Sequence, residues 1–263
     1  MSYALQKQRR INLKNKLKNL EPIYGGWLSF TDPGIAETFC KAGFDFIAID
    51  MEHTTFSLEQ AKSIITSCHS ENVCCLPRPV SHNNDYIKPL LEAGADGMFI
   101  QMVETEEEVK NLINQIKYTP IGQRSYGVNR AHGYGLNFEE YINDWNDTSS
   151  IILQIESIDA VNNIDKLLNF EEVDGVMIGP YDISGSLGVP GQTNHPKVRE
   201  ASQKVIQSAR KFKKSCCTQI SDVSKEKIED AFSQGFTFVI LGSDLFVLTN
   251  WSKQINEVIT KIK

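Results

Sequence analysis

The chain has 263 residues, of which 41% are hydrophobic and 23% are charged, as is usual for a globular protein. Its net charge of −6 argues against nucleic acid as the main partner, because contact with phosphates needs a basic surface. No segment approaches the roughly 18 consecutive apolar residues that a membrane span needs. We therefore expect neither nucleic acid nor a membrane as a partner, whereas an anionic small molecule fits if cations gather locally.

The first 22 residues are basic and lack the apolar core of a signal peptide. Leucines such as Leu13 and Leu17 recur there among lysines and arginines, which predicts a partly amphipathic helix that caps the body of the domain. Membrane contact by this helix is the alternative interpretation.

The six cysteines include two vicinal pairs in apparent strands, and no CxxC motif occurs. Vicinal residues of a strand point to opposite faces, which suits neither a disulfide nor a shared metal ion. We therefore expect six reduced core cysteines in a protein of the cytoplasm.

Eight short apolar segments alternate with segments of helical periodicity, and no linker divides them. They are 24–30, 44–52, 72–77, 95–103, 150–156, 173–179, 215–220 and 236–242. Two capping boxes, at Ser57 with Gln60 and at Thr105 with Glu108, mark helix starts between them. The alternation predicts a (β/α)8 barrel, with 1–263 as a single domain and 1–22 as its helical cap.

An open doubly wound sheet is the structural alternative, but it usually shows a Gly-rich phosphate turn, and no GxGxxG occurs. The interval 118–149 is longer than the other connections and begins with a Gly-rich, basic stretch. We predict that this first part forms a functional loop over the barrel mouth.

Ionisable side chains stand where several of these strands should end. The stretch FDFIAIDMEH, residues 44–53, is an apolar run that finishes in Asp50, Glu52 and His53. Other predicted strands finish at 78, at 154–156 and just before 182. Because active sites of such barrels lie at the C-terminal ends of the strands, we expect these side chains to converge on one pocket.

The residue types at those ends suggest metal and acid–base chemistry. Glu156 and Asp182 follow neighbouring strands and together could hold one divalent cation through oxygen ligands. His53 could move protons near neutral pH, with Asp50 orienting its imidazole. Arg78 could form an ion pair at the rim or clamp an oxyanion, and a nearby metal favours the clamp. Taken singly, each residue could also be an ordinary capping or surface residue.

In order and spacing, these segments resemble the metal-dependent 2-oxo-acid aldolases of the HpcH/HpaI type, within the wider phosphoenolpyruvate/pyruvate barrel group. The resemblance covers most of the chain, roughly from Tyr24 to the C-terminus. It is carried by GGWLSF, AGFDFIAIDMEH, LPRP, IKPLLEAGADGMFIQMVET, YTPIGQRSYG, LQIES, VDGVMIGPYDISGSLGVPG and FVILGSDL.

The resemblance implies a role for individual residues. It makes Glu156 and Asp182 the ligands of a divalent ion such as Mg²⁺, Mn²⁺ or Co²⁺. It makes His53 the general acid/base with Asp50 as its partner, and Arg78 the group that binds the pyruvate oxygen. The substrate-binding residues that it implies are Trp27, Gln154, Tyr181, Asp182, Ser184 and Glu92, the last of which stands where relatives often have an Asp that reaches a neighbouring subunit's site.

The implied activity is reversible cleavage of a 4-hydroxy-2-oxo acid to pyruvate and an aldehyde through a metal-stabilised pyruvate enolate, without a Schiff-base lysine. A malyl- or citramalyl-type thioester lyase, another metal–enolate enzyme, and a catalytically degenerate binding protein are the alternatives. Relatives form hexamers of dimers that exchange C-terminal helices, so a homo-oligomer, with 251–263 at an interface, is expected; packing on its own barrel is the alternative. The segment CCTQISDVSKE departs from the Gly-Leu segment of many relatives, and the loop GVNRAHGYG supplies Arg130 and His132 as candidate contacts of a polar aldehyde. Both differences leave the aldehyde open.

Overall fold

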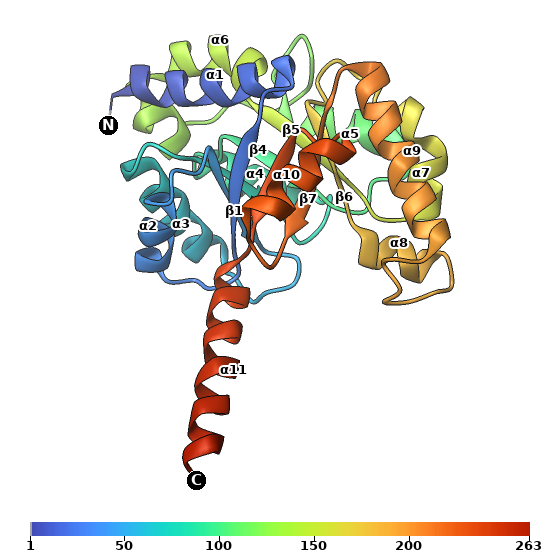
Figure 1. Cartoon of the computed structure of the whole chain (residues 1–263). Coiled ribbons are helices and arrows are strands. Elements are labelled where there is room, and N and C mark those ends of the chain that lie inside the picture. Colours follow the sequence, from blue (N-terminus) through green and yellow to red (C-terminus); the bar gives the residue numbers. More distant parts are fainter. Residues whose placement is uncertain (1) are drawn as a thin grey trace.

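The structure, a computed structural model, describes residues 2–263 (Figure 1). Within these residues eight parallel strands follow the order β3-β2-β1-β8-β7-β6-β5-β4, and β3 also lies beside β4, so that the sheet forms a nearly closed barrel. The strands are β1 Ile23–Leu28, β2 Phe46–Asp50, β3 Cys74–Arg78, β4 Gly97–Ile100, β5 Ser150–Ile155, β6 Gly175–Ile178, β7 Ser215–Ile220 and β8 Phe238–Leu241. The predicted (β/α)8 barrel is confirmed, and the open sheet is excluded.

Helices surround the barrel and close one of its ends. They are α1 Tyr3–Asn19, α2 Pro33–Cys40, α3 Leu58–Ser70, α4 Asn84–Glu92, α5 Glu106–Ile116, η1 Arg130–Gly135, α6 Phe138–Thr148, α7 Ile158–Leu167, α8 Pro180–Ser186, α9 Pro196–Phe212, α10 Lys225–Gln234 and α11 Asp244–Ile262. Both predicted capping boxes are present, at the starts of α3 and α5. Among residues 2–263, no helix combines the length and the apolar character that crossing a membrane would take.

The hydrophobic core has two layers, one inside the barrel and one between the sheet and the outer helices. The inner layer is built of bulky side chains such as Phe46, Phe99 and Trp27, whose rings pack 5.6–5.8 Å apart between centroids. Gly25 makes room for this packing, because a Cβ atom there would lie 2.1 Å from the ring of Phe46. The six cysteines are all buried and free, as the sequence predicts.

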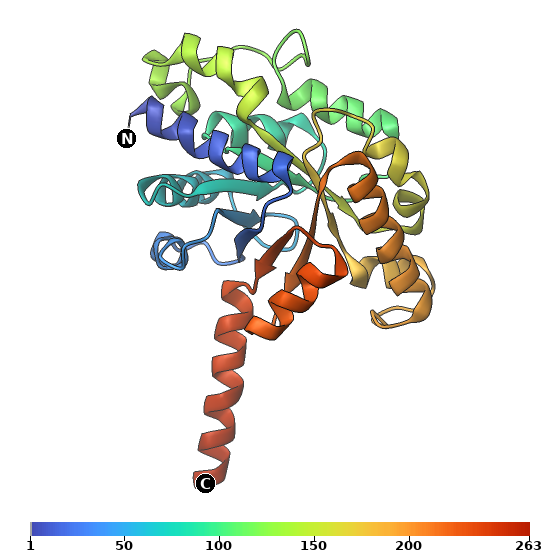
Figure 2. The ribbon, with the colours of Figure 1, turned by 45° about the horizontal axis from the view of Figure 1, so that its top comes forward.

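Helix α1 covers the N-terminal ends of the strands, as Figure 2 shows. Leu13 and Leu17 enter the inner core layer, which confirms the predicted packing of this helix on the barrel. Cations of the same helix are buried as well: Arg9 lies 2.9 Å from Asp96, and Lys14 lies 2.7 Å from Asp174. The closed end is therefore held by apolar contacts and by buried ion pairs together.

The connection between α5 and α6 corrects one prediction, since it lies at this closed end and not over the barrel mouth. Arg130 donates to the carbonyl of Ala93, just before β4, and to Nδ1 of His69. Helix α6 then packs beside α1 (Figure 1). Helix α5 returns the chain to the end where β5 begins, so the connection after this helix cannot reach the mouth. Arg130 and His132 therefore do not contact the substrate cavity of this chain.

The last helix, α11, projects from the open end of the barrel (Figures 1 and 2). Within residues 2–263, Asp244 is the one residue of this helix that is buried, and its carboxylate accepts hydrogen bonds from the main-chain N–H groups of Ser29 and Phe30, at 2.8 Å each. The rest of α11 exposes many large apolar side chains: Leu245, Phe246, Val247, Leu248, Trp251, Ile255, Val258, Ile259 and Ile262.

Candidate active site

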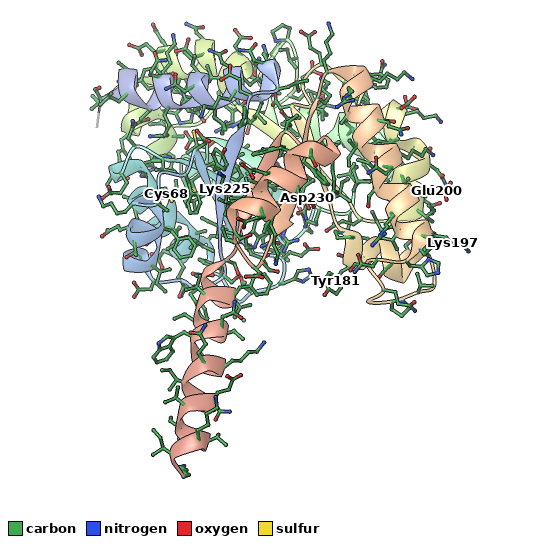
Figure 3. All side chains as sticks on the ribbon, viewed as in Figure 1. Cys68, Tyr181, Lys197, Glu200, Lys225 and Asp230 are labelled. Carbon is green, nitrogen blue, oxygen red and sulfur yellow. The ribbon has the colours of Figure 1, made fainter. Side chains whose placement is uncertain are left out.

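A cavity of about 580 Å³ opens at the C-terminal ends of the strands. Figure 3 shows Tyr181 at this end, on the side from which α11 projects. The residues that line the cavity include Trp27, Asp50, His53, Arg78, Gln154, Glu156, Tyr181 and Asp182. All the predicted site residues except Ser184 and Glu92 are therefore brought together at one cavity.

Arg78 ends β3 and is held on several sides. Its Nε and Nη2 atoms donate to Oδ1 of Asp50, at 3.2 and 2.7 Å, and its Nη1 atom lies 2.7 Å from Oε2 of Glu52. The guanidinium carbon lies 4.9 Å from the centre of the Trp27 ring, which suits a cation–π contact. Because the group is fixed before any ligand arrives, it can stabilise an oxyanion with little reorganisation.

Asp50 shapes the turn that carries His53, but it does not touch the imidazole. Its Oδ1 atom accepts hydrogen bonds from the main-chain N–H groups of Glu52 and His53, at 3.1 and 3.2 Å. The carboxylate nearest the ring is that of Glu52, with Oε2 3.6 Å from Nε2 of His53. The predicted contact between Asp50 and the imidazole is thus absent: Asp50 serves the turn and Arg78. The sequence placed Glu52 at this strand end but carried no signal of its role.

Glu156 follows β5, and each of its two carboxylate oxygens accepts a hydrogen bond. Oε2 accepts a hydrogen bond from the main-chain N–H of Met102 at 3.0 Å, and Oε1 accepts one from the amide of Gln154 at 3.1 Å. Gly179 is required beside it, because a Cβ atom there would lie 2.7 Å from Cγ of Glu156. The direction of the side chain is therefore fixed by Gln154 on β5 and by Met102 and Gly179, which follow β4 and β6.

The electrostatics of Glu156 favour a cation. Burial, together with the nearby charges of Glu52 and Asp182, raises the pKa of its carboxyl group to about 7, although the N–H of Met102 and the charge of Arg78 oppose the rise. A buried carboxylate with like-charged neighbours is stabilised in its ionised form when a positive ion binds.

Two carboxylates provide the donor set for such an ion. Glu156 and Asp182 line the same cavity and follow β5 and β6, which are paired neighbours in the sheet. Within residues 2–263, no group of three His, Cys, Asp or Glu side chains is arranged to hold a metal. A hard divalent cation bound here would therefore take two ligands from the protein and the others from substrate and water. The residues present fit that arrangement.

Two predicted residues lie outside the cavity. Ser184 is fully buried in α8, where its hydroxyl donates to the carbonyl of Tyr181 and accepts from the N–H of Gly191, so it holds the turn and does not face substrate. Glu92 lies near the closed end, 2.9 Å from Nη2 of Arg124. It cannot reach the cavity of its own chain, and its role at a neighbouring subunit's site stays a prediction.

The cavity is also lined by residues that the sequence did not single out. They come from β7, from the loop after it and from α11, and are Thr218, Gln219, Ser221, Asp222, Ser243, Leu245, Phe246, Asn250 and Lys253. The unusual segment after residue 215 was a signal for part of this wall. No local sequence pattern indicated that α11 would contribute to the cavity wall, because its residues have the periodicity of an exposed amphipathic helix.

Comparisons with known proteins agree with this geometry. Residues 24–250 match the family model of the HpcH/HpaI aldolase/citrate lyase family. The 2-keto-3-deoxy-L-rhamnonate aldolase of Escherichia coli (strain K12) is 31% identical over 239 residues, which are 90% of this chain and 88% of that protein. The solved HpcH/HpaI aldolase from Desulfitobacterium hafniense DCB-2 has a TM-score of 0.87 at 28% identity, covering 94% of this chain and 96% of its own.

A third similar protein carries a different name. The solved citrate synthase SbnG has a TM-score of 0.82 at 26% identity and covers 95% of this chain and 98% of its own. The family match spans Arg78, Glu156 and Asp182, which line one cavity. The chain belongs to the HpcH/HpaI aldolase/citrate lyase family and is a metal-dependent aldolase, as its sequence predicts.

Proposed function

We propose that this enzyme reversibly cleaves a 4-hydroxy-2-oxo acid to pyruvate and an aldehyde, with Mg²⁺, Mn²⁺ or Co²⁺ held by Glu156 and Asp182. The observation that carries the proposal is that these two carboxylates and the guanidinium of Arg78 line one cavity. Carboxylate ligands suit a hard divalent ion, and a fixed guanidinium suits an oxyanion.

The residues divide the chemistry between them. The bound cation would supply Lewis-acid stabilisation of the negative charge that develops on the keto oxygen. Arg78 donates to the same oxygen from a position that Asp50 and Trp27 already fix. Trp27, Gln154 and Tyr181 line the cavity and are the proposed substrate contacts.

His53 is the proposed acid–base group. In cleavage His53 takes the proton of the C4 hydroxyl and the C3–C4 bond breaks. The electron pair of that bond passes into the enolate of pyruvate. Protonation of C3 then gives pyruvate, and condensation is the reverse. The His53 side chain lines the cavity and is 68% exposed, so it can exchange its proton with water.

The aldehyde should be polar. By its name, the E. coli relative acts on 2-keto-3-deoxy-L-rhamnonate. In this chain the cavity is also lined by hydroxyl and amide groups, among them Thr218, Gln219 and Ser221. Such groups are satisfied by a hydroxylated aldehyde and would be left unpaired by an apolar one.

We also propose a cytoplasmic homo-oligomer, a hexamer, in which α11 packs on another subunit. Support comes from the apolar side chains that this helix exposes along its length, because a surface of that kind is usually covered. The free cysteines agree with a reducing compartment.

The test is the exchange of pyruvate methyl protons in deuterated water, followed by NMR, with Mg²⁺, Mn²⁺ or Co²⁺ added to chelator-treated enzyme. We expect metal-dependent exchange without any aldehyde, and slower exchange in His53→Ala. His195→Ala is the matched control, because His195 caps α9 outside the cavity. Absence of exchange with all three ions would favour a binding protein instead. If exchange occurs, an aldehyde panel with pyruvate as donor identifies the second substrate.

A further inference from the structure

Glu52 lies between two groups that the proposed reaction uses. Its Oε2 atom is 2.7 Å from Nη1 of Arg78 and 3.6 Å from Nε2 of His53. Asp50 makes no such contact with the imidazole, and its Oδ1 atom instead accepts from two main-chain N–H groups and from Arg78. Glu52 is thus the carboxylate within reach of the ring.

The Oε2 atom of Glu52 also has unused capacity as an acceptor. It is buried, yet among the described residues it accepts no well-aligned hydrogen bond, and its contact with Arg78 is one of charge alone. A buried carboxylate oxygen in this state is costly, and an N–H donor would relieve it. The ring nitrogen of His53 lies a few tenths of an ångström beyond hydrogen-bond distance. Catalytic hydrogen bonds that are long in a free enzyme commonly shorten once substrate is bound.

We propose that Glu52 is a positioning residue for His53: Arg78 holds the Glu52 carboxylate in place, and Oε2 accepts a hydrogen bond from Nε2–H of the imidazole. The inference rests on the proposed function, because it assigns a role within the same site. It also fixes the tautomer of the ring. With the proton on Nε2, the nitrogen that takes the C4 hydroxyl proton is Nδ1.

The competing explanation is that Glu52 only neutralises Arg78. The two explanations differ in the expected result of replacing Glu52 by methionine, which has a similar length but cannot accept a strong hydrogen bond. If Glu52 acts through His53, Glu52→Met changes the state of the ring. If it acts only through Arg78, the ring is unaffected and the binding of pyruvate weakens.

The first measurement is ¹⁵N NMR of the full-length protein labelled at histidine, loaded with Mg²⁺ and pyruvate, at a pH where the ring of His53 is neutral. The resonances are assigned with His53→Ala. We expect mainly the Nε2–H tautomer in the parent protein and a shift toward a mixture in Glu52→Met. Asp222→Asn is the matched control, since Asp222 also lines the cavity, and should leave the tautomer unchanged. A predominant Nδ1–H tautomer in the parent, or an unchanged ring in Glu52→Met, overturns the proposal.

The second measurement is a double-mutant cycle on pyruvate proton exchange. Glu52→Met should lower kcat about tenfold with little change in KM, because a group that orients a catalytic side chain contributes about 10- to 100-fold. In the His53→Ala background the same substitution should have no further effect. A rise in KM that persists in that background would assign Glu52 to Arg78 and overturn the proposal.

A second variant and a measurement that does not depend on activity allow the proposal to be tested even if Glu52→Met fails to fold. Glu52→Gln keeps the shape of the side chain and one oxygen acceptor, so it should fold and should show a smaller tautomer shift in the same direction. The NMR signal also does not depend on turnover. If the proposed function is wrong, the parent protein will show no pyruvate proton exchange. If only the role of Glu52 is wrong, the tautomer of the His53 ring will be unchanged in Glu52→Met.

Discussion

The two ends of the barrel bury carboxylates in opposite ways. At the closed end, Asp96 is 1% exposed, and Arg9 and His69 contact its two oxygens at 2.9 and 3.0 Å. Burial alone would raise the pKa of Asp96, but Arg9 and His69 hold it well below its usual range. At the open end, Glu156 is 5% exposed, and burial, together with the nearby carboxylates of Glu52 and Asp182, raises its pKa to about 7.

Burial by itself therefore does not mark a functional acid. A buried carboxylate that contacts a cation belongs to the structure, whereas a buried carboxylate that has hydrogen-bond donors but no cation in contact is completed by a positively charged ligand. The closed end supplies its own cations through α1. The open end should therefore obtain the charge that it lacks from a bound metal ion.

The largest expected effect is that of Glu156→Gln. It should lower metal-dependent pyruvate exchange by at least about 10⁴-fold, since a catalytic metal contributes several kcal/mol to charge stabilisation. The unfolding temperature of the chelator-treated protein should not fall, because the substitution removes a buried carboxylate that has like-charged neighbours. Exchange within tenfold of the parent enzyme would show that Glu156 is not part of the site.

The same change of acid to amide at the closed end should have the opposite result. Asp96→Asn removes the carboxylate charge that contacts the buried guanidinium of Arg9, and breaking a buried ion pair costs about 3–5 kcal/mol of the free energy of unfolding. Urea unfolding would measure this loss. Exchange per folded molecule should stay near the parent value. If Asp96→Asn lost activity but kept its stability, the buried acids of the two ends would not differ in role as we infer.

Arg78→Lys should have an intermediate effect on activity. The lysine keeps the positive charge but cannot contact Asp50 and Glu52 with a planar fork, so the oxyanion loses a fixed donor. We expect a decrease of about 10²-fold in kcat, as is typical when one such donor is removed. A large rise in KM with kcat unchanged would point instead to ordinary substrate binding by Arg78.

The smallest expected effect is a pH dependence of stability that originates in His69. Burial lowers the pKa of its ring from 6.5, partly offset by Asp96, and Arg130 donates to its Nδ1 atom. The unfolded chain therefore binds more protons than the folded one below about pH 6.5, so this stability is present above that pH and is lost as the pH falls. Urea midpoints of the parent and of His69→Gln should diverge in this direction. Parallel profiles would exclude His69 as the source.

The sequence was most informative where a local pattern determines the structure. Apolar runs and capping boxes located the strands and helices, and the rule that parallel strands end at one face predicted that Arg78, Glu156 and Asp182 would meet. The segment after α5 was misplaced because its length and composition do not reveal which end of the barrel it occupies. Its position after a helix does, since such connections return to the N-terminal ends of the strands.

Other features could not be read because they depend on distant partners. Arg9 and Lys14 of α1 are buried because they pair with Asp96 and Asp174, which are 87 and 160 residues away in the sequence. The leucine pattern alone suggested a simple apolar face. At the site, the direction in which Asp50 and Ser184 point is set by turns only a few residues long. Two carboxylates near one histidine, Asp50 and Glu52, could not be told apart without coordinates.

The most direct test of the central claim is the binding of Mn²⁺ to chelator-treated protein, measured by electron paramagnetic resonance of the free ion. We predict one Mn²⁺ per chain in the parent enzyme and in Asp96→Asn, and affinity at least about 100-fold lower in Glu156→Gln and in Asp182→Asn. Unchanged, tight binding of one ion by both of these variants would contradict the account, because the carboxylates of the open end would then not be what holds the metal.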